Sequence, residues 1–126
     1  MIITINDSSD IPIYLQLRNQ IVQGISTGQL SPGEQLPTVR TLALEIGINS
    51  MTVSKAYQIL KQEGYITTDR RSGARIRQSF PKQNQLSESN RELLKQIISE
   101  AQIQGLSKDD FLKECELLYQ TGRSAD

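Results

Sequence analysis

Residues 31–77 read SPGEQLPTVRTLALEIGINSMTVSKAYQILKQEGYITTDRRSGARIR, and this stretch decides the fold of the chain. It contains two apolar-periodic segments, residues 38–46 and 50–63, separated by Gly47. Hydrophobic residues that recur every three or four positions indicate helices, and glycine favours the left-handed conformation at which a helix ends. Residues 65–68 and 74–77 flank a basic turn, which is typical of a β-hairpin. This order predicts a winged helix-turn-helix, a fold whose second helix enters the major groove of DNA.

The two helices of this stretch have recognisable ends and inner faces. Asn49 or Ser50 can cap the second helix by accepting a backbone hydrogen bond, and Gly64 can close it. The two prolines and the glycine before the first helix turn the chain sharply. The positions expected to face the core are Val39, Leu42, Ala43, Ile46, Val53, Ala56, Tyr57 and Leu60.

Segments on either side complete the plan of the chain. A helix over about residues 12–28 precedes the quoted stretch, and the polar residues 79–89 are expected to be a linker. Two amphipathic helices are expected over residues 88–104 and 108–121. The predicted fold is mostly α with a small β-hairpin: a winged helix-turn-helix domain over residues 1–78, a linker over 79–89 and a two-helix tail over 90–126.

Length and composition fit a small protein of the cytoplasm. The chain has 126 residues, 14.2 kDa and 37% hydrophobic residues, enough for a modest core. Neither a membrane span of about 20 apolar residues nor a signal sequence is recognisable. The single cysteine, Cys115, cannot form an internal disulfide, which favours a reducing compartment.

The charge is zero overall but unevenly distributed. Residues 1–78 contain eight Lys and Arg against six Asp and Glu, a net charge of +2, and residues 79–126 contain six against eight, a net charge of −2. Within residues 65–78, four arginines face a single acid, Asp69. Positive charge is therefore concentrated where a phosphate backbone would need it.

Candidate DNA contacts lie on the second helix, the first helix and the hairpin. Ser and Thr hydroxyls can address bases or phosphates, Met51 can pack on a thymine methyl, and Lys55 can reach a phosphate or a guanine edge. Arg40 can make a forked contact that lysine cannot. Gly73 lets the hairpin backbone approach a phosphate, flanked by arginines. The candidate set is Arg40, Ser50, Met51, Thr52, Ser54, Lys55, Arg70, Arg71, Gly73 and Arg75.

Each of these residues also has a simpler explanation. Serine and threonine at a helix start are often only caps, and arginines on a hairpin can simply protect an exposed strand edge. Arg40 could pair with Glu34 or Glu45. Their order and spacing together favour DNA binding over these separate explanations.

The same residues resemble the GntR family of bacterial transcription regulators. The resemblance is carried by PGEQLPTVRTLALEIGINSMTVSKAYQILKQEGYI with the following Ser-Gly turn, and by IYLQLRNQIVQGISTGQL before it, and covers about residues 10–77. It implies DNA contacts by Arg40, Ser50, Met51, Thr52, Ser54 and Gly73.

The chain departs from the family pattern at two places. The family often has a Gly-x-Gly turn in the hairpin, whereas here Arg71 stands at the first glycine position. Many relatives carry arginine at the start of the second helix, where this chain has Ser50 and Ser54. The operator sequence therefore cannot be transferred from such relatives.

The short tail is similar to that of the YtrA-like branch of the family, in which two helices serve dimerisation. Two amphipathic helices are too small for a core of their own, so we expect them to bury their apolar faces against a second copy; packing on the same subunit is the alternative. The expected dimerisation residues are Leu93, Leu94, Ile97, Ile98, Ala101, Phe111, Leu112, Cys115, Leu118 and Tyr119.

The function favoured by the sequence is a homodimeric repressor that binds double-stranded DNA at an inverted-repeat operator. The tail is too small to enclose a ligand of about 300 Å³ within one subunit, so an effector is expected, if anywhere, between subunits. An enzyme is disfavoured because the chain has no histidine, no metal-ligand spacing and no nucleotide-binding glycine loop, and no cofactor is expected. A winged-helix protein-interaction module without specific DNA binding is the alternative.

Overall fold

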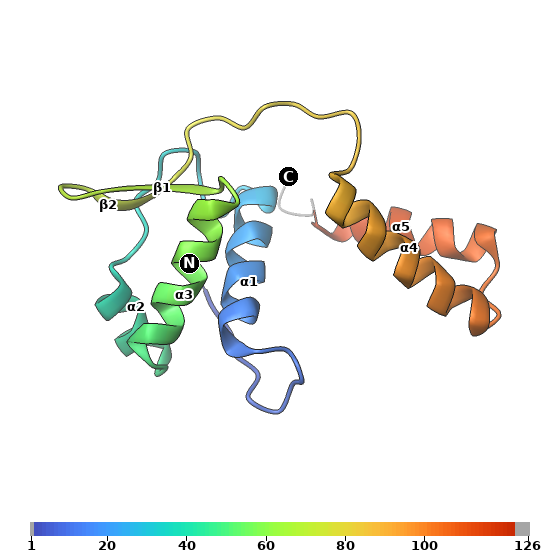
Figure 1. The fold of residues 1–126 in the computed structure, drawn as a ribbon, viewed down its shortest axis with the longest axis horizontal. Coiled ribbons are helices and arrows are strands. Elements are labelled where there is room, and N and C mark those ends of the chain that lie inside the picture. The colour runs from blue at the N-terminus through green and yellow to red at the C-terminus, as the bar shows by residue number, and fades with distance from the viewer. Residues whose placement is uncertain (1, 123–126) are drawn as a thin grey trace. The chain divides into compact units, whose positions relative to one another are not determined.

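The computed structural model describes residues 2–122 and contains two compact units. The first unit runs from the N-terminus to Phe80, and the second begins at Pro81. Among the described residues the first unit has three helices and a hairpin, and the second has two helices, labelled in Figure 1. The elements of the first unit are α1 (Ile13–Thr27), α2 (Val39–Ile46), α3 (Ser50–Gln62), β1 (Ile66–Asp69) and β2 (Gly73–Ile76); those of the second are α4 (Glu88–Ile103) and α5 (Lys108–Gly122).

The helices of the first unit begin and end where the sequence predicts. Asn49 caps α3, because its side-chain oxygen accepts from the N–H of Met51 at 2.7 Å. Thr38 caps α2 in the same way, and its Oγ1 accepts from the N–H of Thr41 at 3.1 Å. Gly47 ends α2 in the left-handed conformation with φ of 69°. Its conformation produces the tight turn between α2 and α3.

The core of the first unit lies where α1, α2, α3 and the hairpin meet. α3 packs against both α1 and α2 and also contacts β1. One face of each helix supplies the buried side chains, and the hairpin adds one isoleucine from each strand. The largest fully buried side chains are Leu17 and Ile21 of α1, Leu42 of α2, Val53 and Leu60 of α3 and Ile76 of β2.

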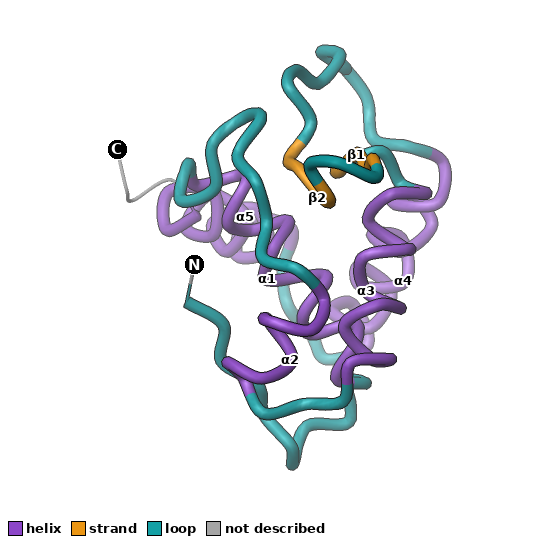
Figure 2. Tube along the Cα trace, turned by 90° about the vertical axis from the view of Figure 1, so that its left-hand side faces the viewer, coloured by secondary structure: helices purple, strands orange, loops and turns teal. Residues whose placement is uncertain are grey.

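The hairpin is one residue out of step with the sequence prediction. β1 and β2 pair from Ile66 opposite Ile76 to Asp69 opposite Gly73, whereas the sequence suggested strands over 65–68 and 74–77. The difference arises at the turn, because Gly73 still pairs with Asp69 and so belongs to the ladder. These are the only strands in the described residues (Figure 2).

The loop before α2 adds a third row of backbone pairing to the hairpin. The N–H of Leu36 donates to the carbonyl of Ala74 at 2.8 Å, and the N–H of Ile76 donates to the carbonyl of Glu34 at 2.8 Å. Buried Tyr57 fixes the next part of this loop, since its hydroxyl donates to the Pro37 carbonyl at 2.8 Å. Burial raises the pKa of Tyr57, so the hydroxyl keeps its proton and stays a donor. The hairpin is thereby joined to the start of α2.

Two glutamines of α1 hold the N-terminal segment in place. The side chain of Gln16 accepts from the N–H of Asn6 at 2.9 Å and donates to the Asn6 carbonyl at 3.0 Å. One helical turn later, Gln20 makes the same pair of bonds with Thr4. An amide side chain has both a donor and an acceptor, so each glutamine pairs with a backbone residue as a neighbouring strand would.

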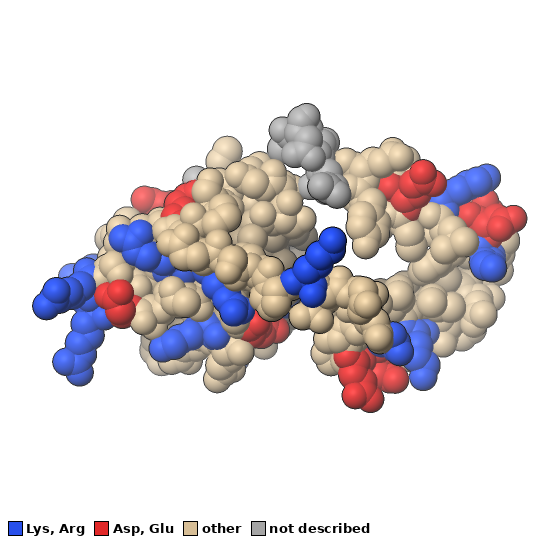
Figure 3. All heavy atoms as spheres, turned by 90° about the horizontal axis from the view of Figure 1, so that it is seen from above, with Lys and Arg blue, Asp and Glu red and all other residues tan. Residues whose placement is uncertain are grey.

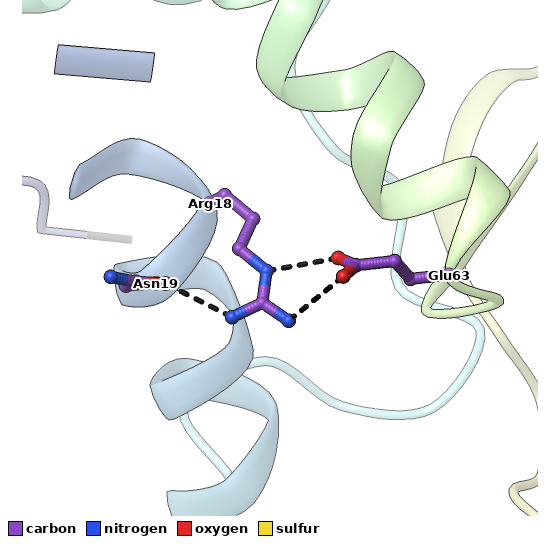
Figure 4. Close-up of polar contacts among 3 residues, drawn as sticks. All are labelled: Arg18, Asn19 and Glu63. Atoms are coloured by element: carbon purple, nitrogen blue, oxygen red, sulfur yellow. Dashed lines mark hydrogen bonds and ion pairs between the residues drawn. The ribbon is translucent and has the colours of Figure 1, made fainter. Parts of the chain in front are cut away.

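An ion pair joins α1 to the end of α3. Nε of Arg18 lies 2.9 Å from Oε1 of Glu63, and Nη2 lies 3.3 Å from Oε2, a forked contact that Figure 4 shows beside Asn19. The guanidinium carbon also lies 5.6 Å from the centre of the Tyr65 ring, which in turn lies 6.2 Å from the Phe80 ring. These contacts hold the last residue of the first unit on its surface.

The second unit consists of two helices without a core of their own. Ser87 caps α4, and Ser107 caps α5 by accepting from the N–H of Asp110 at 3.1 Å. Residues 88 and 89, which fall both in the predicted linker and in the predicted helix over residues 88–104, belong to α4 because the Ser87 cap starts the helix there. No described residue after Phe80 is buried in the chain.

Candidate nucleic-acid interface

The surface of α3 that faces away from the core contains the residues predicted to read DNA. Val53, Ala56, Tyr57 and Leu60 are buried, so helical geometry turns the intervening positions outward. Met51 is 77% exposed, an unusual position for a large apolar side chain in a small domain. Ser50 and Lys55 are exposed, and Thr52 and Ser54 are half-buried.

Two hollows flank this face of α3. The first, of about 600 Å³, is open and is lined by Tyr14, Met51, Thr52, Ser54, Lys55 and Gln58. The second, of about 360 Å³, lies between α3, the loop before α2 and the hairpin, and its lining includes Ser54, Gln58, Lys61 and Gly73. Ser54 and Gln58 line both hollows, so they lie on the ridge between them. Four of the five predicted residues of α3, all but Ser50, therefore share one continuous surface with the hairpin glycine.

Arg40 lies in the first turn of α2 with its side chain exposed. No hydrogen bond or ion pair of its guanidinium occurs within residues 2–122, so the alternative pairing with Glu34 or Glu45 is absent from that part of the chain. Its five donors are therefore available to a ligand.

The tip of the hairpin is built around the side chain of Asp69. Its carboxylate accepts from the N–H groups of Arg71 and Ser72, each at 2.7 Å, and from the Ser72 hydroxyl at 2.6 Å. The Ser72 hydroxyl and these N–H groups lower the pKa of Asp69 below its usual value. Gln35 adds a brace by donating to the Ser72 carbonyl at 2.8 Å. Asp69 therefore has a structural role in presenting Arg70 and the residues after it.

This turn explains why the chain tolerates arginine at the first glycine position of the family pattern. Gly73 has φ of 69°, and among residues 2–122 only glycines have a positive φ. Arg71 thus lies in a conformation open to any residue, and the turn needs only one glycine. The exposed side chains of Arg70 and Arg71 both leave this braced turn.

Arg75 is placed differently from the other arginines of the hairpin. It is half-buried, and its Nη1 donates to the carbonyl of Gly33 at 3.1 Å. Its backbone also pairs with Gln35 in an isolated bridge. Arg75 therefore ties the hairpin to the loop before α2, a tertiary contact that the sequence does not reveal.

Positive charge gathers on the hairpin end of the first unit. Figure 3 shows Lys and Arg side chains projecting from the left-hand end, where the β1–β2 hairpin lies in Figure 1. The exposed cations of the described surface around α3 and the hairpin are Arg40, Lys55, Lys61, Arg70, Arg71 and Arg77.

Three residues of this surface are missing from the sequence-based set. Gln58 and Lys61 follow Ser54 at helical spacing, so the periodicity of α3 could have identified them. Tyr14 comes from α1 and reaches the surface only because α1 packs beside α3. No local signal in the sequence predicts that contact.

Comparison with known proteins places this interface in a family. The family model described as bacterial regulatory proteins, gntR family, matches residues 13–76, which include α1, α2, α3 and both strands. The chain belongs to the GntR family. It is a transcription regulator whose winged helix binds DNA, and the family is one of DNA-binding regulators rather than enzymes.

Similarity beyond the winged helix identifies the YtrA-like branch. The chain is 35% identical to the transcriptional repressor YtrA of Bacillus subtilis over 98% of this chain and 99% of the relative. It is 37% identical to the solved structure of YtrA from Sulfolobus acidocaldarius, with a TM-score of 0.63 and coverage of 82% and 99%.

A second solved structure resembles nearly the whole chain. A protein described as a transcriptional antiterminator from Listeria monocytogenes has a TM-score of 0.86 and 31% identity, and the match covers 97% of this chain and 92% of that one. The predicted fold class, a mostly α winged helix-turn-helix with a two-helix tail, is thus confirmed. No helix within the described residues is long and apolar enough to cross a membrane.

The exposed guanidinium of Arg40 gives a first prediction. Arg40→Ala should weaken binding to the preferred operator by about 1–3 kcal/mol, the value of one bidentate base contact. Arg40→Lys is the matched control, because it keeps the positive charge but cannot make the forked contact. Relative to Arg40→Ala, it should regain affinity for random DNA but little of the preference for the operator. Fluorescence anisotropy with operator and random duplexes measures both. An unchanged operator affinity in Arg40→Ala would remove this residue from the interface.

The braced turn gives a second prediction, in which two variants of equal charge are compared. Asp69→Ala removes every acceptor of the turn, whereas Asp69→Asn keeps one carbonyl oxygen. We expect Asp69→Ala to bind random duplex DNA about two- to tenfold more weakly than Asp69→Asn, since the arginines would lose their ordered support. Equal affinity of the two variants would show that the turn does not position the arginines.

The same turn should depend on pH in a defined direction. A lowered folded-state pKa means that the contribution of Asp69 is complete above the ordinary carboxyl value of about 3.9 and is lost as the pH falls through the lower folded-state value. An NMR titration should show the Ser72 amide shifting with the Asp69 carboxyl, below the range of free aspartate. Titration at the ordinary value would contradict the bonding at this turn.

Proposed function

We propose that the chain is a homodimeric repressor that binds an inverted-repeat operator in the cytoplasm. The observation that carries this proposal is a difference in structure between the two units. The first unit has a core and one DNA-reading helix, and the second has apolar faces that its own chain does not cover. Two copies joined through the second unit would present two α3 helices to DNA.

The exposed apolar surface of the second unit supports a partner. α4 and α5 have 16 and 15 residues, close to the length at which isolated helices are marginal in water, and in proteins most helical stability comes from packing of an apolar face. Leu93, Ile97, Leu118 and Tyr119, four of the expected dimerisation residues, are each more than half exposed in the single chain. Large apolar side chains in such numbers mark an interaction surface.

The remaining expected dimerisation residues line a groove between α4 and α5. The groove has a volume of about 470 Å³, and its walls are mainly apolar. Six of the expected residues line it: Leu94, Ile98, Ala101, Phe111, Leu112 and Cys115. The single apolar face expected on α4 is therefore divided between an inner row on the groove and an outer row at Leu93 and Ile97.

A second copy is the occupant that fits both rows. A closed two-fold dimer uses the same patch of each chain, so the inner groove and the outer row can both be covered by the partner's equivalent helices. Two-fold symmetry also gives two equivalent recognition helices, which would have to lie about one turn of DNA apart, roughly 34–36 Å, to meet two half-sites. An inverted-repeat operator is the sequence that matches such a pair.

The sign of regulation and the effector follow from different observations. Repression is supported by the similarity along the whole chain to a relative named as a repressor. For the effector, the sequence predicts a tail too small to enclose a ligand of about 300 Å³ within one subunit. The groove between α4 and α5 is larger than that, at about 470 Å³. A small apolar effector in this groove would compete with the packing of the dimer.

Selection from a random duplex library at about 150 mM salt tests the operator. We expect the full chain to enrich a two-fold symmetric consensus whose half-sites are about 10 base pairs apart. Enrichment of a single, asymmetric half-site would contradict the inverted repeat. Absence of any enriched sequence would contradict sequence-specific regulation.

The role of the tail can be tested by removing it. The chain ending at Phe80 keeps the whole core of the first unit, so we expect it to stay folded, to be a monomer, and to bind operator DNA much more weakly than the full chain. Sedimentation and circular dichroism measure mass and folding. A dimer that persists without residues 81–126 would refute the assignment of the tail.

Point variants in the full chain separate the outer row from the rest of the tail. Ile97→Glu places a charge on the exposed apolar row, whereas Ser99→Glu adds the same charge at an exposed, polar position of α4 four residues after Lys95. The first should weaken the dimer at least tenfold, because an unpaired charge is costly to bury, and the second should not. Equal dimer affinity of both variants would remove Ile97 from the interface.

A further inference from the structure

Lys55 on α3 lies against an aromatic ring from α1. Its Nζ is 3.9 Å from the centre of the Tyr14 ring, well within the range at which an ammonium is attracted to a ring face. Tyr14 belongs to the first turn of α1, and Lys55 belongs to the second turn of α3. The two helices pack side by side, which brings these distant residues together.

The two side chains differ in mobility. The Tyr14 ring is half-buried and packs against the core, so its position is fixed by the fold. Lys55 is exposed and has four rotatable bonds, which would leave a free ammonium spread over many positions. Contact with the ring restricts the ammonium before any ligand arrives, so less freedom is lost on binding.

The Lys55 ammonium is also not engaged by any carboxylate of the described residues. Within residues 2–122 no carboxylate lies within ion-pairing distance of Lys55; the ion pairs of this part of the chain join Arg18 to Glu63 and Lys95 to Glu92. A ring face attracts an ammonium without neutralising it. Tyr14 therefore orients the charge of Lys55 while leaving it available.

We propose that Tyr14 is a positioning residue for DNA binding, and that its ring holds the Lys55 ammonium for a phosphate of the DNA backbone. This inference rests on DNA binding through α3 and is independent of the dimer and of the inverted repeat. Phosphate is favoured over a base edge because Tyr14 draws the ammonium toward α1. In helix-turn-helix proteins the base edges are met by the start of the recognition helix, whereas flanking elements contact the backbone.

The experiment measures binding of the full chain to a random-sequence duplex of about 30 base pairs, over about 50–200 mM salt. Phosphate contacts are independent of sequence, so this probe needs no knowledge of the operator. The variants are Tyr14→Leu, Tyr14→Phe, Lys55→Met and the double variant Tyr14→Leu with Lys55→Met. Lys82→Met is the matched control, because it removes one exposed charge from the segment between the two units.

Lys55→Met should weaken binding about fivefold and lower the slope of log K against log salt by about 0.9, the contribution of one phosphate. Tyr14→Leu should weaken binding about two- to fivefold, and Tyr14→Phe should bind like the natural chain because it keeps the ring. The double variant should be no weaker than Lys55→Met alone, since the ring acts only through the lysine. Lys82→Met should leave both affinity and slope nearly unchanged.

Three results would overturn the proposal. If the affinity losses of Tyr14→Leu and Lys55→Met multiplied in the double variant, the ring would not act through the lysine. Equal losses in Tyr14→Phe and Tyr14→Leu would assign the effect to the hydroxyl. Wild-type affinity and slope in Lys55→Met would remove the phosphate contact, even if the selected operator still showed two-fold symmetry. Thermal unfolding of each variant separates these results from loss of the fold.

Discussion

The structure depends on the buried face of α3. Val53, Ala56 and Leu60 are fully buried against α1, α2 and the hairpin, so α3 can neither rotate nor shift without exposing them. Burial of a side chain such as Val53 or Leu60 stabilises by about 1.5–3 kcal/mol, which is large beside the stability of a small domain. Because helical geometry is fixed, holding this face inward also determines which residues face outward. The surface proposed to read DNA is therefore determined by the packing of the core.

The other contacts of the first unit hold neighbouring parts against that surface. Tyr57, on the core face of α3, donates a hydrogen bond from its hydroxyl to the loop before α2. Backbone hydrogen bonds join the same loop to β2. Arg75 and Asp69 then brace the hairpin from two sides. The exposed arginines are thus connected to α3 through a short series of hydrogen bonds. A change at the hairpin tip should therefore affect DNA binding more than it affects folding.

Much of this arrangement could be predicted from the sequence because its signals are local. The cap at Asn49, the glycine after α2 and the inward positions of the helices all follow from short-range patterns, and the structure has them where expected. The strand boundaries were wrong by one residue, since backbone pairing at a turn depends on geometry that composition does not contain. The contacts of Arg75 with Gly33 and of Lys55 with Tyr14 join residues about 40 positions apart, and no periodicity could have indicated them.

The tail is the part of the chain on which the proposed dimer depends. Its helices have clear apolar rows and good caps, and the chain leaves large apolar side chains of both helices exposed. The central claim is that two chains act together on one symmetric site. Native mass measurement of the full chain bound to a symmetric operator duplex tests it most directly. We expect two chains per duplex. Scrambling one half-site should weaken binding and leave the duplex only partly occupied. One chain per duplex, with no loss on scrambling, would contradict it.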